Sequence, residues 1–566
     1  MQPGIQHLHT YFLFPFSIDK QAVLEDHQDL WANRPHWIDG VDAWIGAHGG
    51  SSPLLETLGP WRRASYTRFD MDSAAYQDMV FFHPVVRRVF FDTGDGGGAS
   101  GEDESLLRCY SIPVLAPSRL WLEAEDAKGR RASVQVTDLR LLMFANCIGI
   151  LSIGIEAFGL PAADALWINE SLRKVYPSSG RQVREGRVPN RIALVLEQGD
   201  QRRPLVEERF ENGQMIGFQP PLARHITALL YFANYQDQEF EPVLDERMIV
   251  YTYFTVDPAT LPAESIHGEQ YRALLSRFLY VDRAGESYRY EPEFTRALLD
   301  KHLYTRWAHQ GTWYGFTSYS NISATMGTFD CDEHDLREGF LIHRMFRTRY
   351  YLMAVVALFY RATLLEFSER TALVSRHLYR DQEDGKLTTQ NIRLASDLRA
   401  EFLHFSNYWH FDELANKDEE MDHFTLQCRE YRIEPMKQEI EGEIDKLNVS
   451  LHNYYQFRNT EAVNRLAMLS LLFGAGAVLT GFFGMNFGVR FEKLFFQPDP
   501  STLGFHWTAV AAVTLLALGA LLFGFYVVAA NWADYRDTLV PRRWRSTQEG
   551  GSLKRGPAPP GGRENA

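Results

Sequence analysis

The chain has 566 residues, of which 45% are hydrophobic and 23% are charged, and its formal net charge at pH 7 is −14. This length allows several domains, and this composition argues against global disorder. The acidic balance argues against a nucleic-acid-binding protein, because there is no basic surplus to neutralise phosphates, and it suits a protein that attracts cations.

Residues 1–334 are predicted to form a cytosolic α/β domain. Short apolar or alternating runs recur in this region, and turn-rich stretches separate them. The runs cover residues 11–16, 85–91, 139–144, 149–155, 192–197, 226–232 and 248–256. The region does not start with a basic segment followed by a long apolar run. We therefore expect no signal peptide and a cytoplasmic location for this domain.

Two local patterns in this domain resemble ligand sites without meeting their requirements. The Gly-rich stretch 93–98 lacks the lysine of a P-loop and the terminal glutamate of an EF-hand, so we interpret it as a hairpin tip. Residues 330–335 have metal-ligating types, but consecutive residues cannot all face one ion, and helix capping explains their acids. The sequence contains no GxSxG, HExxH or Walker motif, and we do not expect an enzyme.

Residues 335–434 are predicted to form a helical part of the cytosolic region. Within it, residues 350–359 are apolar, but Arg349 and Arg361 bound the run. Because about 20 apolar residues are needed to cross a bilayer, we expect a buried helix there. The acidic run 417–422 is interpreted as a solvated helix face, with a cation-sensing surface as the alternative.

One long helix is predicted over residues 435–486, with a cytosolic stalk that continues into a first membrane span. Pro435 suits a first helical turn, and no proline interrupts the chain from there to Phe487. Apolar or aromatic residues recur at steps of three and four, which places them on one face of a helix. These residues are Met436, Ile440, Ile444, Leu447, Leu451 and Tyr454.

Two uncharged apolar segments, residues 466–483 and 508–530, are predicted to cross the membrane as helices. Trp507 and Trp532 bracket the second segment, and we assign the second span to residues 507–531. Basic residues precede the first segment and follow the second, whereas the loop 487–506 holds few. The positive-inside rule then places both termini in the cytoplasm and the loop outside. Residues 532–566 are expected to form a basic, partly disordered cytosolic tail.

A stripe of small residues follows one face of the first span, formed by Ser470, Gly474, Ala477, Gly481 and Gly484. The stripe alone favours close helix packing over the lining of a narrow path. The tripeptide Gly484-Met485-Asn486 closes the span. The Asn486 amide offers a carbonyl oxygen without the cost of burying a charge. In a ring of subunits, such oxygens would converge and hold hydrated Mg²⁺, which usually keeps several of its waters.

The long helix, the tripeptide at the end of the first of two spans, the loop and the basic end together resemble the CorA family of divalent-cation channels. The resemblance covers residues 436–545, about a fifth of the chain. It implies a CorA-like funnel, with an α/β cytosolic domain, a stalk helix and a two-helix transmembrane hairpin. It also implies a homopentamer in the cell (inner) membrane, with the first spans around the pore, divalent cations and lipid as partners, and no cofactor.

The resemblance assigns roles to individual residues. Gly484, Met485 and Asn486 would form the selectivity filter, with Asn486 holding the hydrated ion through water. By the helical period, the pore would be lined by Thr460, Val463, Leu466, Ser470, Gly474 and Ala477. Leu466 is the bulkiest of these residues and the candidate for a hydrophobic constriction. A basic collar at the inner mouth would contain Arg542, Arg543 and Arg545.

The loop departs from the family pattern. The first acidic residue after the tripeptide is Glu492, and Lys493 lies beside it, so the loop attracts external cations only weakly. Transport of Mg²⁺, with Co²⁺ or Ni²⁺ as further ions, is the leading interpretation. A zinc transporter of the same family, with or without proton coupling, and a membrane-anchored sensor or scaffold that does not conduct are the alternatives.

Overall fold

The computed structural model divides the chain into two units, residues 1–448 and 449–566, which are described separately. It describes residues 3–32, 37–47, 53–64, 80–92, 106–114, 117–176, 183, 185–186, 188–209, 220–244, 247–261, 268–285, 290–326, 341–383 and 387–484. Beyond these, it describes residues 511, 515, 516, 518, 519, 522, 523, 526 and 530. The predicted hairpin tip at residues 93–98 and the acidic run 330–335 lie outside the described residues.

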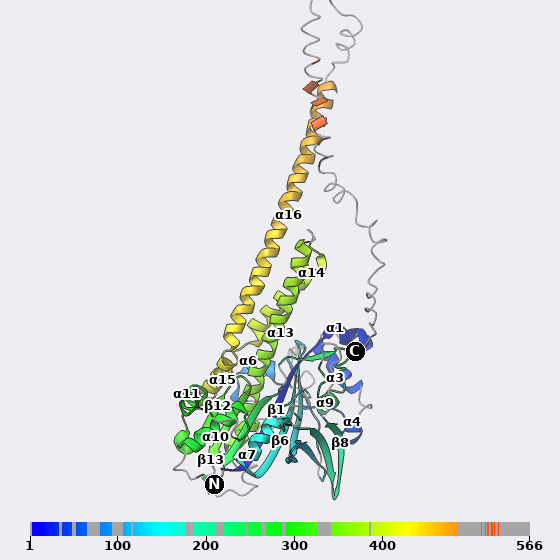
Figure 1. Ribbon diagram of the computed structural model, residues 1–566. Helices are drawn as coiled ribbons and strands as arrows, with labels where there is room; N and C mark the ends of the chain where they lie inside the picture. Colours follow the sequence, from blue (N-terminus) through cyan, green and yellow to red (C-terminus); the bar gives the residue numbers. More distant parts are fainter. Residues whose placement is uncertain are drawn as a thin grey trace, which may run out of the picture. The chain divides into compact units, whose positions relative to one another are not determined.

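A mixed sheet forms the centre of the first unit (Figure 1), with 13 strands among the described residues. The strands are β1 (Gly4–Ile18), β2 (Arg62–Arg63), β3 (Leu107–Ser111), β4 (Arg119–Glu125), β5 (Arg131–Phe144), β6 (Ile148–Pro161), β7 (Arg191–Gln198), β8 (Gln201–Arg209), β9 (Phe240–Pro242), β10 (Ile249–Val256), β11 (Leu303–Tyr304), β12 (Thr312–Phe316) and β13 (Ser320–Met326). Their order is β11-β12-β13-β10-β1-β6-β5-β4-β7-β8, with β2 beside β3, β3 beside β5 and β9 beside β1. The β10–β13 pair is parallel, and the other described pairs are antiparallel.

Strand β1 lies in the middle of this sheet, between β10 and β6. From one face of this strand, the large apolar core includes Leu8, Phe12, Phe14, Phe16 and Ile18. Because side chains alternate along a strand, His7, His9 and Tyr11 share the opposite face. A register shift against β10 between Ile5 and His7 marks a bulge beside these residues. The central strand therefore separates an apolar layer from a layer that also contains polar rings.

Helices lie on both faces of the sheet. The described helices of the chain, not all of which contact the sheet, are α1 (Lys20–Asp26), α2 (Gln28–Trp31), α3 (Trp37–Ala47), α4 (Pro53–Leu58), α6 (Pro84–Phe90), α7 (Ala162–Leu172), α9 (Arg224–Leu229), α10 (Glu269–Tyr280), α11 (Pro292–His302), α12 (Leu341–Arg347), α13 (Arg349–Glu383), α14 (Thr389–His404), α15 (Asp418–Glu430) and α16 (Ile433–Gly484), with short 3₁₀ and π turns at Ala308–Gln310 and Phe405–Trp409. Buried residues of α7 and α10 join the apolar core with Leu8 and Phe12. Helix α13 contacts β1 and β6, and on the face of β1 that carries Tyr11 it places Tyr351 against that ring.

Five of the seven apolar runs that suggested strands lie in β1, β5, β6, β7 and β10. The other two runs, residues 85–91 and 226–232, contribute to the helices α6 and α9. Pro84 occupies the first turn of α6, where its fixed φ suits a helix. The buried side chains of α6 are Val86, Val89 and Phe90, and this spacing matches one face of a helix.

The predicted burial of residues 350–359 is confirmed, since nearly all of them are buried within α13. Among the described residues, one helical stretch, Leu341–Asp381, is long and apolar enough to cross a membrane by length and composition. Of its most apolar window, 72% is buried inside the protein, as in the core helix of a globular domain. The two spans that the sequence predicts further along the chain stay predictions.

The acidic run 417–422 is only partly a solvated face. Asp418 and Asp422 are exposed on α15, but Glu420 is buried at 5% exposure. Its Oε1 atom lies 3.5 Å from Arg349 Nη1 and 3.8 Å from Lys417 Nζ. Glu420 thus pairs with protein cations, and the interpretation as a wholly solvated face is wrong at this residue.

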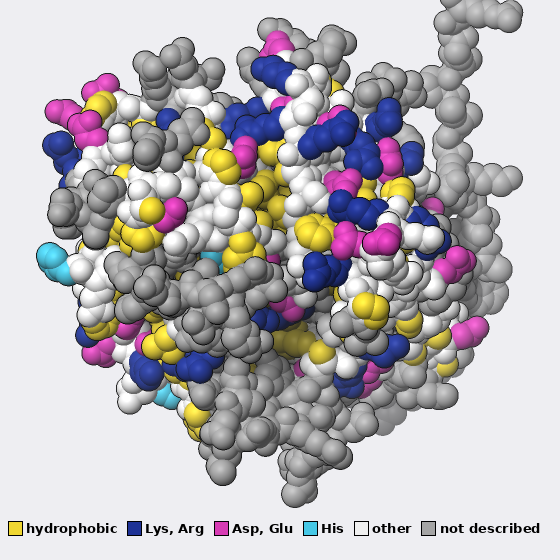
Figure 2. Space-filling view, turned by 90° about the horizontal axis from the view of Figure 1, so that it is seen from below, with side chains coloured by type: hydrophobic (Ala, Val, Ile, Leu, Met, Phe, Trp, Pro, Cys, Tyr) yellow, Lys and Arg dark blue, Asp and Glu magenta, His cyan; other side chains and the backbone are white. Residues whose placement is uncertain are grey.

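Surface charges elsewhere in the first unit are also paired. On the face drawn in Figure 2, Lys and Arg side chains lie beside Asp and Glu side chains. On the strands β4, β7 and β8, Glu123 lies 3.2 Å from both Arg191 and Arg202. Exposed pairs of this kind contribute roughly 0–1 kcal/mol each, so they solubilise the surface more than they stabilise the fold.

Helix α16 begins at Ile433, two residues before the predicted start, and has 52 residues. Arg432 adopts a left-handed φ of 56°, which separates α16 from α15. In the predicted apolar stripe, Ile440 and Ile444 are buried at 2% and 4% exposure, and Met436 and Leu447 are half-buried. This part of the helix therefore packs through its apolar face onto the first unit.

Candidate ion path and a buried histidine cluster

The residues predicted to line an ion path lie on α16. Gly484 is the last residue of that helix. The predicted lining residues are all exposed, namely Thr460, Val463, Leu466, Ser470, Gly474 and Ala477. Met485 and Asn486 of the predicted filter, and Arg542, Arg543 and Arg545 of the predicted collar, lie outside the described residues. Their roles stay predictions.

The face of α16 that is predicted to line the ion path is exposed in a single chain. Val463 is 56% exposed and Leu466 is 65% exposed. A methyl group added at Gly474 would meet no described atom within 4 Å. Because the six predicted residues recur at steps of three and four, they share one side of the helix. This side has room for a neighbouring helix or for an ion path.

Exposed apolar side chains gather in the second unit. Among the described residues, 12 of the 20 large exposed hydrophobic side chains lie beyond residue 448. They include Phe473 on α16 and, further along the chain, Leu516 and Tyr526 at 76% and 69% exposure. Large exposed apolar patches mark surfaces that a membrane or another protein covers. The exposed apolar side chains of the second unit therefore require a membrane or another protein to cover them.

Charges and hydroxyls on α16 are satisfied within the helix around the start of its apolar part. Glu461 pairs with Arg458 at 3.6 Å and with Arg465 at 2.5 Å. Further along, the Thr480 hydroxyl donates to the Gly476 carbonyl oxygen at 2.9 Å. Internal pairing of polar groups is what a helix requires where water is absent.

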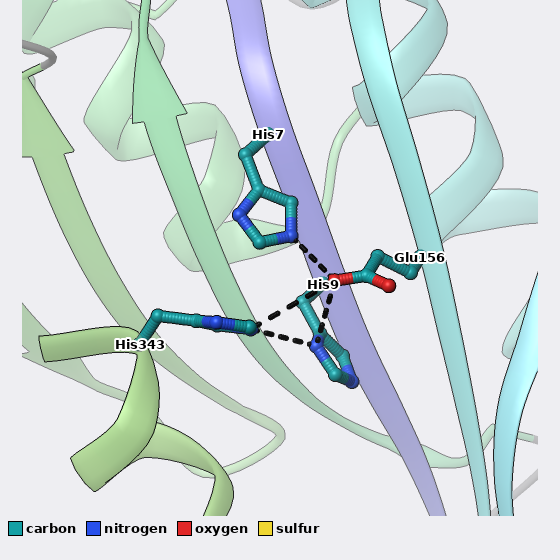
Figure 3. A group of neighbouring side chains, drawn as sticks. All are labelled: His7, His9, Glu156 and His343. Carbon is teal, nitrogen blue, oxygen red and sulfur yellow. Dashed lines mark hydrogen bonds and ion pairs between the residues drawn. The ribbon is translucent and has the colours of Figure 1, made fainter. Parts of the chain in front are cut away.

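A second group of residues with chemical potential lies in the first unit, far from α16 in sequence. His7 and His9 project from β1, Glu156 projects from the neighbouring strand β6, and His343 projects from α12 (Figure 3). The alternation of β1 places both of its histidines on one face, and the sheet register sets His9 directly opposite Glu156. Helix α12 covers this face and adds the third imidazole.

The four side chains point toward one another at short distances. His7 Nε2 lies 2.7 Å from Glu156 Oε1, and His9 Nδ1 lies 2.9 Å from His343 Nε2. The same Glu156 oxygen lies 3.7 Å from His9 Nδ1 and 4.0 Å from His343 Nε2. One ligand atom from each residue falls within 4.8 Å of all the others. The group can therefore hold a single ion or share protons.

Burial and aromatic rings isolate this histidine cluster from water. The exposed fraction is 1% or less for the three histidines and 8% for Glu156. His7 stacks on Phe158 at 4.5 Å between ring centroids, and His9 stacks on Tyr11 at 4.9 Å. Burial, and after it the neighbouring His343, lowers the pKa of His9 well below its usual value. The His9 imidazole is therefore neutral at pH 7, the form that coordinates metals.

The sequence contains a partial signal for the histidine cluster. His7 and His9 alternate with Leu8, as two residues on one face of a strand do. The predicted apolar run begins only at residue 11, so it does not include this pair. The sequence offers no local signal for His343, which is 334 residues from His9.

Comparison of the chain with protein-family models, with curated proteins and with solved structures found no match. The resemblance to the CorA family accordingly rests on the residues of the C-terminal segment, and the function that it implies is a proposal.

Proposed function

We propose that this chain is a membrane channel for divalent cations, with Mg²⁺ as the leading ion and Co²⁺ or Ni²⁺ as further ones. The observation that carries the proposal is the position of Gly484-Met485-Asn486. The tripeptide begins at the last residue of a 52-residue helix whose apolar end part is exposed in a single chain. That surface suits a helix that lipid and other copies of the chain surround.

The proposed channel is a homopentamer in which the α16 helices surround one axis. Asn486 carbonyl oxygens would form a ring that holds the waters of a hydrated ion, which suits Mg²⁺ because it loses water reluctantly. Below this ring, Ser470, Gly474 and Ala477 leave a path of small side chains. Leu466 would then form an apolar constriction, where loss of water closes the path.

A second candidate is zinc transport by the same architecture. The weakly acidic loop favours it, because Glu492 is the first acid after the tripeptide and Lys493 lies beside it. Ion flux through a channel follows the electrical gradient, whereas flux through a proton-coupled transporter follows the pH gradient.

The large first unit instead favours a sensor or scaffold that the second unit merely anchors. Such an anchor has no need of the Asn486 amide.

The deciding experiment measures Mg²⁺ and Zn²⁺ flux into proteoliposomes at matched and opposed pH. It compares the native chain with Asn486→Ala and with Asn453→Ala, a matched control at an exposed position of α16 outside the predicted span. We expect Mg²⁺ entry without a pH gradient, a loss of at least tenfold in Asn486→Ala, and native flux in Asn453→Ala.

Other outcomes identify the alternatives. Zn²⁺ entry that requires an opposed pH gradient would favour the coupled transporter. If neither ion moves, or if Asn486→Ala and the native chain are indistinguishable, the second unit is an anchor and the channel proposal is wrong.

A further inference from the structure

The proposed ion path uses only the second unit and the end of α16, and it leaves the histidine cluster without a role. We propose that His7, His9, His343 and Glu156 bind one divalent transition-metal ion of the Zn²⁺ class inside the first unit. The ion would join the central strands β1 and β6 to helix α12. This inference does not depend on whether the chain conducts ions.

The donor set selects the class of ion. Three imidazole nitrogens and one carboxylate oxygen suit Zn²⁺ and its neighbours Co²⁺, Ni²⁺ and Cu²⁺. Mg²⁺ and Ca²⁺ prefer sites built from oxygen ligands alone. The histidine cluster is therefore chemically distinct from the oxygen ring proposed for the transported ion.

The spacing of the donor atoms fits tetrahedral coordination. Zinc binds nitrogen and oxygen ligands at about 2.0–2.1 Å, which separates neighbouring ligands of a tetrahedron by about 3.3 Å. Four of the six separations among the donor atoms of the histidine cluster are 2.7, 2.9, 3.7 and 4.0 Å, and all six are within 4.8 Å. They lie on both sides of this value, so small rotations of the side chains would bring all four atoms to one ion.

The backbone holds these ligands in place before an ion binds. His9 and Glu156 are directly paired residues of two central strands, and β1 has hydrogen-bonded neighbours on both sides. The rings are fixed further by packing, since His343 contacts His7 edge-on at 4.5 Å between centroids. Ligands on rigid elements lose little conformational entropy on binding, which favours affinity.

Internal hydrogen bonds alone leave the histidine cluster incompletely satisfied. His7 Nδ1 is buried and has no hydrogen-bond partner among the residues that the structure describes. The contact of His9 Nδ1 with His343 Nε2 joins two nitrogens, so one of them carries the proton and donates it, and the lone pair of the other accepts. Three imidazoles gathered around one buried carboxylate are costly without a compensating interaction. Coordination of a cation supplies that interaction.

Burial has a consequence for how the ion enters. Since the ligands are at most 8% exposed, exchange with solution requires α12 to move away from the sheet. We therefore expect the ion to be taken up as the chain folds and to leave slowly. A bound ion would also stabilise the first unit, because the unfolded chain has no preformed site.

The test uses the full-length chain, produced in zinc- or cobalt-supplemented medium and purified in detergent. Metal content is measured by elemental analysis, and the Co²⁺-loaded protein is examined for the visible absorption of a tetrahedral ion with nitrogen ligands. His343→Ala removes the one ligand that is not on the sheet. His225→Ala is the matched control, because His225 is equally buried in the same unit but is not part of the histidine cluster.

We expect about one ion per native chain, native content in His225→Ala, and at least a tenfold loss of bound metal in His343→Ala. Asn486→Ala should keep its metal, which separates this site from the proposed filter. If His343→Ala does not fold, Glu156→Gln keeps the shape of the side chain and should lose metal instead. A native chain that holds no metal after loading, or folded cluster variants that hold as much as the native chain, would overturn the proposal.

Discussion

A single buried imidazole makes the fold sensitive to acid. His225 lies on α9 with 2% of its surface exposed, and neither of its ring nitrogens has a hydrogen-bond partner within the described part of the chain. Burial lowers the pKa of His225 to about 4, from an ordinary value of 6.5. The unfolded chain therefore binds this proton more readily than the folded chain. The stability is fully present above pH 6.5 and falls by up to about 1.4 kcal/mol per pH unit as the pH drops toward 4.

We expect His225→Leu to reduce this loss, because leucine has a similar size and no proton to bind. The measurement compares the melting temperature of the native chain and the variant in detergent at pH 7.5 and pH 5.0. Between pH 7.5 and pH 5.0, the free energy of unfolding of the native chain should fall by about 2 kcal/mol more than that of the variant. An equal loss in both proteins would show that His225 does not titrate in this range.

The residues of the histidine cluster are not predictable from the sequence alone. The metal-ligating types at residues 330–335 are adjacent in sequence, whereas the histidine cluster joins residues from three separate elements. Alternation along β1 predicts that His7 and His9 share a face, but only the sheet register places Glu156 opposite His9. Side chains that meet through tertiary packing leave no periodic pattern, so His343 could not be assigned from the sequence.

At the scale of elements, the length of a hydrophobic pattern determines whether a helix or a strand can be predicted from it. The stripe along α16 repeats over many turns, and the helix begins within two residues of the predicted start. The runs at residues 85–91 and 226–232 have seven residues each, too few to distinguish the period of a strand from that of a helix. The apolar run at residues 350–359 could be interpreted correctly because its flanking arginines leave it too short for a membrane span.

The small-residue stripe on α16 leads to a prediction with an internal control. Gly474 belongs to the stripe, whereas Gly476 is two residues away and faces nearly the opposite side of the helix. An added methyl group meets no described atom within 4 Å at either position, so the isolated helix accepts a side chain at both. We expect Gly474→Leu to abolish Mg²⁺ flux in proteoliposomes and Gly476→Leu to retain most of it.

The two leucines carry the same helix propensity, so any difference between these variants reflects the face on which they lie. Equal loss in both would mean that general packing in the membrane, and not the stripe, determines activity. Equal retention would place the ion path on another side of α16.

At the scale of the whole molecule, exposed apolar surface leads to a prediction about assembly. The face of α16 that carries Val463 and Leu466 is open in one chain, and a pore requires several copies around it. We expect light scattering in detergent to give a protein mass of five times the 65.1 kDa of one chain. A monomer or dimer would contradict the pore, because neither can enclose an axis with α16.

The central position of β1 also sets the order in which the fold can be completed. Its partner β10 is made roughly 240 residues later, and α12 later still. At about 5–20 residues per second, the ribosome needs on the order of 10–50 s to supply β10. Throughout this interval a strand rich in Phe and Leu lacks at least one of its neighbours. The growing chain is therefore most exposed to misassembly and aggregation early in its synthesis, before the predicted membrane segments have been made.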